Sequence, residues 1–120
     1  MIVDLPFPHK LLWPNGGHGK HYAVAGERKK HHAWAHGAAL EAKQRQGWTD
    51  TGEDIPVRLI VHAKRKGPLP DMDNCVAASK GFLDGIAAAL SVNDKRFLAP
   101  VVEYGLPRDG RFVFLIGRTL

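Results

Sequence analysis

The sequence has very little cysteine, no long apolar run and no excess of acidic residues. Cys75 stands alone in 120 residues, so no internal disulfide can form and the secreted, disulfide-stapled class of protein is excluded. No apolar stretch approaches the roughly 20 residues that a membrane-spanning helix requires. The first ten residues show no basic leader followed by an apolar run, so we expect no signal peptide. These absences predict a cytoplasmic protein with no membrane partner.

What is present is typical of one globular domain. Hydrophobic residues make up 44% and charged residues 24% of the chain, which is the composition of a folded protein. At this length we expect a single domain spanning residues 1–120. Lys and Arg total 17 against 12 Asp and Glu, giving a net charge of +5. This excess favours a polyanionic partner such as DNA, and an ordinary positive surface is the alternative explanation.

The first half of the chain predicts a strand, a helix and a second strand. Residues 1–5 alternate in the manner of a strand. Residues 27–46 lack proline and are rich in Ala, Lys, Gln and Glu, so they predict a helix that ends at Gly47. Residues 56–63 alternate again, which predicts a strand with one buried face.

The second half predicts the longest amphipathic helix, over residues 73–90. Its apolar positions recur every seven residues, at Val76, Leu83 and Leu90. Asp73 is the predicted N-cap, because its carboxylate can accept the first free backbone N–H groups of the helix.

Two further strands are expected over residues 101–105 and 111–116. The turn Pro107-Arg108-Asp109-Gly110 between them predicts a hairpin. This order of elements indicates the α/β class, a single domain in which a mixed β-sheet packs with two main helices.

Acidic residues gather at both ends of the second predicted helix. Asp71 and Asp73 lie at its start, and Asp94 follows its end. Hard divalent cations such as Mg²⁺ prefer carboxylate oxygens, so these three residues are the candidate metal ligands. Because an 18-residue helix is about 27 Å long, Asp94 reaches the other two only if the chain folds back or a second chain supplies it.

One face of that helix combines a lysine with an acid. With 100° of rotation per residue, Lys80 and Asp84 lie on nearly the same side of the predicted helix as Asp73. Lys80 could neutralise a phosphate, or it could simply pair with Asp84 on an ordinary polar face. For Asp84 we prefer the ordinary polar face.

The run Pro70-Asp71-Met72-Asp73-Asn74, the helical Lys80 followed by Leu-Asp-Gly-Ile, and the later Asn93-Asp94 together resemble the RusA-type Holliday-junction resolvases. These are endodeoxyribonucleases of phages and prophages. The opening Leu5-Pro6-Phe7-Pro8 is also similar to the family's N-terminal segment. The sequence departs from the family pattern in one place, because the family lysine falls where this chain has Ala77, one turn before Lys80.

The resemblance implies a RusA-like domain that cuts four-way and other branched DNA junctions with Mg²⁺ as a homodimer. It implies metal-binding, catalytic roles for Asp71, Asp73 and Asp94, with Lys80 as a further catalytic residue. The expected DNA contacts come from the basic segments, at Lys20, Lys29, Lys30, Lys64, Arg65 and Lys66. Two alternatives stay open: a non-catalytic basic DNA-binding protein with the same fold, and a structural protein whose acids only cap a helix.

Overall fold

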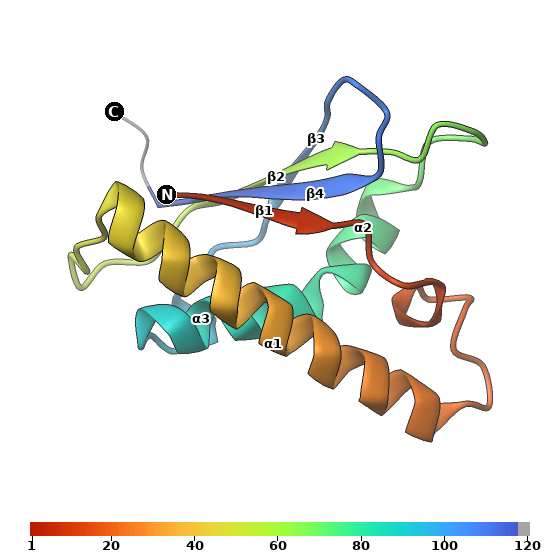
Figure 1. Cartoon of the computed structure of the whole chain (residues 1–120), viewed down its shortest axis with the longest axis horizontal. Helices are drawn as coiled ribbons and strands as arrows, with labels where there is room; N and C mark the ends of the chain where they lie inside the picture. Colours follow the sequence, from red (N-terminus) through yellow and green to blue (C-terminus); the bar gives the residue numbers. More distant parts are fainter. Residues whose placement is uncertain (118–120) are drawn as a thin grey trace.

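The computed structural model describes residues 1–117 and confirms the predicted α/β class with a mixed sheet. Residues 1–117 form four strands and three α-helices (Figure 1). Two short 3₁₀ turns, η1 and η2, join them. In chain order the elements are β1 (Ile2–Pro6), η1 (Lys10–Leu12), α1 (His21–Gln46), β2 (Val57–His62), α2 (Met72–Ala78), α3 (Lys80–Leu90), η2 (Asp94–Arg96), β3 (Val101–Tyr104) and β4 (Arg111–Ile116).

The sheet is mixed, with strand order β1-β4-β2-β3. Strands β2 and β3 run parallel, whereas β4 is antiparallel to both β1 and β2. The predicted hairpin between β3 and β4 is therefore wrong, because β2 lies between them in the sheet. The helical segment that follows β2 returns the chain to the same end of the sheet, and this allows β3 to pair in parallel at the edge.

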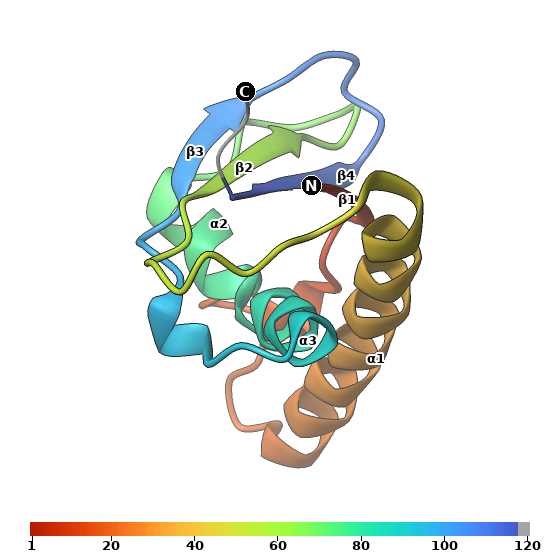
Figure 2. The same ribbon diagram turned by 90° about the vertical axis from the view of Figure 1, so that its left-hand side faces the viewer.

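The helices α1 and α3 cover one face of the sheet (Figures 1 and 2). The core lies between these two layers, where the inward side chains of the strands meet Phe82 and Ile86 of α3. Phe82 contacts Phe112 and Phe114 of β4 in edge-to-face arrangements, a geometry that aromatic rings prefer. No helix within residues 1–117 is long and apolar enough to cross a membrane.

The packing of α1 on α3 depends on small side chains. On α1 the buried positions include Ala35, Ala39 and Ala42. On α3, a Cβ added to Gly85 would lie 2.3 Å from the backbone oxygen of His32, so only glycine permits this approach. The helix α1 also begins at His21, earlier than the predicted residue 27.

The predicted helix over residues 73–90 is two helices, because the chain bends at Ser79. The Ser79 hydroxyl donates a hydrogen bond of 2.8 Å to the backbone oxygen of Val76. A serine side chain that bonds to its own helix competes with the regular ladder and favours such a bend. As a result, Asp73 lies on α2 and Lys80 on α3, so the predicted single helical face that would carry both residues is wrong.

Candidate metal and nucleic-acid site

The start of α2 presents two exposed carboxylates, those of Asp71 and Asp73. Asp71 is the N-cap of α2, and its Oδ1 accepts a hydrogen bond of 3.2 Å from the backbone N–H of Asp73. The sequence predicted Asp73 as the cap, but Asp73 already lies in the first helical turn. Capping uses one oxygen of Asp71, so its second oxygen and the whole Asp73 carboxylate face outward.

Strand β3 holds the segment that leads into this pair of acids. The Tyr104 hydroxyl donates a hydrogen bond to the backbone oxygen of Pro70. Burial, together with nearby Cys75 and the negative charge of Asp71, raises the pKa of the Tyr104 phenol. The sequence alone gave no sign of this contact, which joins residues 34 positions apart.

Cys75, in the first turn of α2, is fully buried. Burial, and to a smaller extent the charge of Asp71, raises the pKa of its thiol to about 11. A buried, protonated thiol is a poor nucleophile and a poor metal ligand, so Cys75 serves the packing beneath the two carboxylates.

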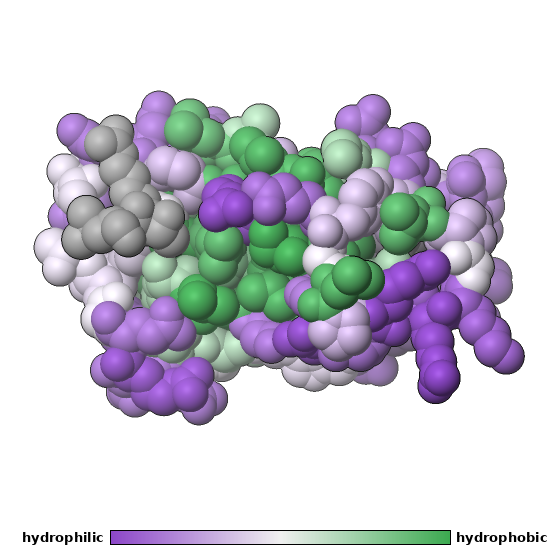
Figure 3. Space-filling view, turned by 90° about the horizontal axis from the view of Figure 1, so that it is seen from above, coloured by the Kyte–Doolittle hydropathy of each residue, from purple (hydrophilic) through white to green (hydrophobic). Residues whose placement is uncertain are grey.

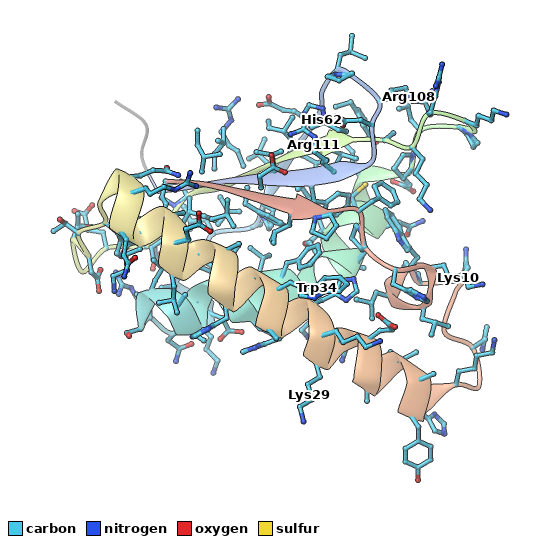
Figure 4. The ribbon with its side chains drawn as sticks, in the orientation of Figure 1. Lys10, Lys29, Trp34, His62, Arg108 and Arg111 are labelled. Carbon is cyan, nitrogen blue, oxygen red and sulfur yellow. The ribbon has the colours of Figure 1, made fainter. Side chains whose placement is uncertain are left out.

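A basic loop precedes the two acids. Lys64, Arg65 and Lys66 are all exposed, and they follow directly from the end of β2. Arg108 donates a hydrogen bond of 2.7 Å to the backbone oxygen of Gly67 and so ties this loop to the β3–β4 connection (Figure 4). Arg108 is a second residue that sequence reasoning missed, because the contact spans 41 positions.

A surface groove of about 220 Å³ lies between the basic loop and the N-terminal segment. Phe7 stacks on Trp13 with ring centroids 5.2 Å apart. The ammonium of Lys64 lies 5.4 Å from the Phe7 centroid, a cation–π distance. The groove thus combines aromatic and proline surfaces with cations, and it is lined by Phe7, Trp13, Lys64, Lys66, Gly67, Pro68 and Pro70.

Asp94 lies in a second acidic pair. The chain folds back after α3, and η2 places Asp94 against Asp84. Burial, followed by the charge of Asp94 and a hydrogen bond shared with it, raises the pKa of Asp84. Lys80 and His32 oppose this effect more weakly. Sequence reasoning expected Asp84 to be an ordinary polar residue and did not foresee its contact with Asp94.

The three candidate metal ligands are not gathered at one point in the single chain. Within residues 1–117, no three His, Cys, Asp or Glu side chains lie close enough to hold a metal together. Asp71 and Asp73 are neighbours at the start of α2, whereas Asp94 is paired with Asp84. Lys80 is exposed at the first position of α3, where its charge acts on Asp84.

The remaining predicted DNA contacts lie on or just before α1. Lys29 projects from α1 on the side away from the sheet, whereas Arg108 lies beside the basic loop at the opposite side of the molecule (Figure 4). Lys30 forms an ion pair of 3.4 Å with Glu27, and Lys20 is exposed immediately before the helix. The basic residues of α1 and those of the loop therefore form two separate surfaces.

Comparison with known proteins places the chain in a family without assigning an activity. No family profile matches the sequence. A protein of Xylella fastidiosa (strain Temecula1 / ATCC 700964), described as uncharacterized, is 34% identical over 118 residues. The match covers 95% of this chain and 74% of the relative. The chain belongs to the family of that protein. Because the match takes in nearly the whole domain, the relative is a suitable second protein for each experiment below.

Proposed function

We propose that the chain is a metal-dependent, structure-selective endodeoxyribonuclease that hydrolyses phosphodiesters in four-way and other branched DNA junctions as a homodimer of RusA type. The observation that carries the proposal is the pair of exposed carboxylates at the start of α2, directly after an exposed basic loop. A nuclease needs this combination, because cations must hold the phosphate backbone while carboxylates hold a metal beside it.

The basic loop supplies the phosphate contacts of the proposal. Lys64, Arg65 and Lys66 are exposed and can therefore pair with phosphates, Lys64 from its position over the Phe7 ring. The adjoining groove offers aromatic and proline surfaces against which an unpaired base can stack. In the open form of a four-way junction the base pairs at the branch point lose a stacking neighbour, so a groove that can stack on a base supports a preference for branched DNA over a regular duplex.

The donor set at the start of α2 fits Mg²⁺. This ion commonly takes one or two protein carboxylates and completes its shell with waters and substrate phosphates. Asp73 and the free oxygen of Asp71 are such donors. When bound there, the ion would supply an activated water and would stabilise charge on the leaving oxygen. We propose Asp94 as the third carboxylate that binds the metal.

The residues around the donor set have separate tasks. Tyr104 fixes the backbone at Pro70, which orients the Asp71 carboxylate. Lys80, exposed at the start of α3, supplies a positive charge for the scissile phosphate. Positive charge at this point stabilises the transition state more than the ground state, because negative charge builds up on the phosphate as the bond breaks.

One observation favours a second candidate, a non-catalytic DNA-binding protein with the same fold. Within the described part of the chain, Asp94 is paired with Asp84 and no three ligands converge. A chain that binds junctions without cutting them would need only the basic loop and the groove.

The deciding experiment compares a labelled four-way junction with a linear duplex of the same sequence, in Mg²⁺ and in EDTA. We expect the junction to be bound in both conditions and cut only in Mg²⁺, with the linear duplex left intact. An Asp71→Asn preparation made in parallel excludes a contaminating nuclease, and Asp94→Asn tests the third carboxylate. Binding without cleavage would establish the second candidate. Failure of both binding and cleavage would reject both.

A further inference from the structure

The sheet has one face that no element within residues 1–117 covers. Side chains at alternate positions point away from the helices, and on this outer face they are largely apolar. Ile2 is 50% exposed and Val101 is 59% exposed. Between them across the sheet lie the outward side chains of Ile60, Val113 and Leu115, as the strand register shows.

Figure 3 looks down on this outer face and shows apolar side chains over much of its centre, crossed by a band of polar ones. Apolar patches of this extent mark interaction sites on soluble proteins. On the face that the helices cover, by contrast, β1, β2 and β4 bury their apolar side chains, and Val102 of β3 is partly buried against them.

The charges on the outer face point to the kind of partner. Arg58 pairs with Glu103 at 2.8 Å, and Arg111 pairs with Asp4 at 2.8 Å. Although the chain carries a net charge of +5, these two arginines and two acids cancel within the face. A face of balanced charge around an apolar centre does not suit a polyanion, whereas it can meet a copy of itself without net repulsion.

The size of the face suits the centre of a dimer interface. Its four strands have four to six residues each, so at about 3.3 Å per residue and about 4.8 Å between strands the sheet covers about 300 Å² in projection. The residues that surround the sheet would supply the rest of the about 800 Å² that each partner gives to a stable interface. Two sheets can pack face to face at about 10 Å through alternating apolar side chains.

We infer that a second copy of this chain packs on the outer face of the sheet, related to the first by a two-fold axis. The inference rests on the proposed function in one respect: it names the interface of the dimer that junction cleavage requires. Since the helices lie on the opposite face (Figure 2), this pairing leaves the start of α2 accessible in each copy, so that one dimer presents two sites.

The test measures assembly without DNA or metal, so its result is independent of nuclease activity. The double variant Ile2→Glu with Val101→Glu places carboxylates in the apolar contact, at positions whose exposure allows the single chain to tolerate them. The matched control is Leu40→Glu, on α1, where the leucine is 40% exposed. Sedimentation should give twice 13.2 kDa for the wild type and the control, and at least about a hundredfold weaker dimerisation for the double variant.

A second measurement covers the case in which the double variant does not fold. Since Cys75 is fully buried, a cysteine introduced at Val113, in the middle of the face, is the single reactive thiol of the native protein. A flexible bismaleimide should cross-link Val113→Cys into dimers and should leave Leu40→Cys largely monomeric. A wild type that sediments as a monomer at high concentration overturns the inference. So does a dimer that the face variants leave unchanged, because it would use a different surface.

Discussion

The molecule contains two pairs of neighbouring aspartates, and their settings differ. Asp71 and Asp73 are exposed at the start of a helix and follow a basic loop. Asp84 and Asp94 face each other, with Asp84 half-buried and its pKa raised by burial and by the charge of Asp94. The first pair is open to a metal and a phosphate. The two carboxylates of the second pair repel each other, and a bound proton or a nearby cation reduces this repulsion. We therefore propose that the essential metal contacts lie at the first pair.

The largest effect should come from the first pair. Asp71→Asn and Asp73→Asn should each lower the rate of junction cleavage by at least about a hundredfold, because removing a ligand removes metal stabilisation worth several kcal/mol. Junction binding should stay the same or tighten, since a negative charge is removed beside the phosphates. Asparagine can still cap α2, so Asp71→Asn should keep its fold.

Quantitative cleavage and binding assays on the same preparations check this expectation. Glu41→Gln is the matched control, because Glu41 is an exposed acid of α1 that pairs only loosely with Arg45 at 3.8 Å. Near wild-type cleavage by either Asp71→Asn or Asp73→Asn would contradict the proposed metal site at the start of α2.

The two pairs also show how far sequence reasoning reaches. The strands, the mixed sheet and the exposed acids after a basic loop could all be predicted, because they depend on alternation and on local spacing. The bend at Ser79 was missed because the apolar spacing of Val76, Leu83 and Leu90 continues across it, although Ser79 with the nearby Gly81 is a known cue for a kink. The contact of Asp94 with Asp84 and that of Tyr104 with Pro70 depend on how distant segments pack. Similarly, Pro107-Arg108-Asp109-Gly110 connects β3 to β4, but the predicted hairpin does not form, because these strands are not neighbours in the sheet.

A smaller effect is expected at Lys80, whose charge acts on Asp84 of the second pair. If its charge serves the phosphate bound at the first pair, Lys80→Ala should lower cleavage by at least about tenfold, equivalent to about 1.4 kcal/mol, with little change in binding. The double variant Ala77→Lys with Lys80→Ala should recover part of the activity, because Ala77 is exposed near the end of α2. If Lys80→Ala cuts normally, Lys80 serves only to offset the charge of Asp84.

The basic loop should affect binding rather than chemistry. Binding should weaken steeply as salt rises, and replacing Lys64, Arg65 and Lys66 by glutamine should reduce the slope of log K against log salt by about 0.9 for each phosphate that is no longer neutralised. Lys29→Gln with Lys30→Gln is the informative comparison, because these lysines lie on a separate surface. An equal change in slope from both sets would mean that DNA contacts α1 as much as the loop that leads to the first pair.

The smallest effect should appear in folding stability, and it should have opposite signs at the two pairs. The ordinary pKa of an aspartate is 3.8, and that of Asp84 is raised in the folded protein. Between these two values the folded state binds more protons than the unfolded state, so stability falls as pH rises through this window. Asp84→Asn removes this destabilisation. The variant should be more stable than the wild type at neutral pH by about 0.2–0.5 kcal/mol, the size of a like-charge pair on a helix.

Asp73→Asn should have the opposite sign, because a carboxylate in the first turn of a helix is stabilised by the helix dipole. Its removal should cost about 0.3 kcal/mol, the lower end for such interactions, as α2 has only seven residues. Urea unfolding at pH 7 measures the two differences, and the one for Asp84→Asn is measured again below pH 3.8, where Asp84 is largely protonated. The Asp84→Asn difference should shrink at the lower pH. If Asp84→Asn is less stable than the wild type at pH 7, then Asp84 and Asp94 are held together by a favourable contact, and the contrast between the two pairs fails.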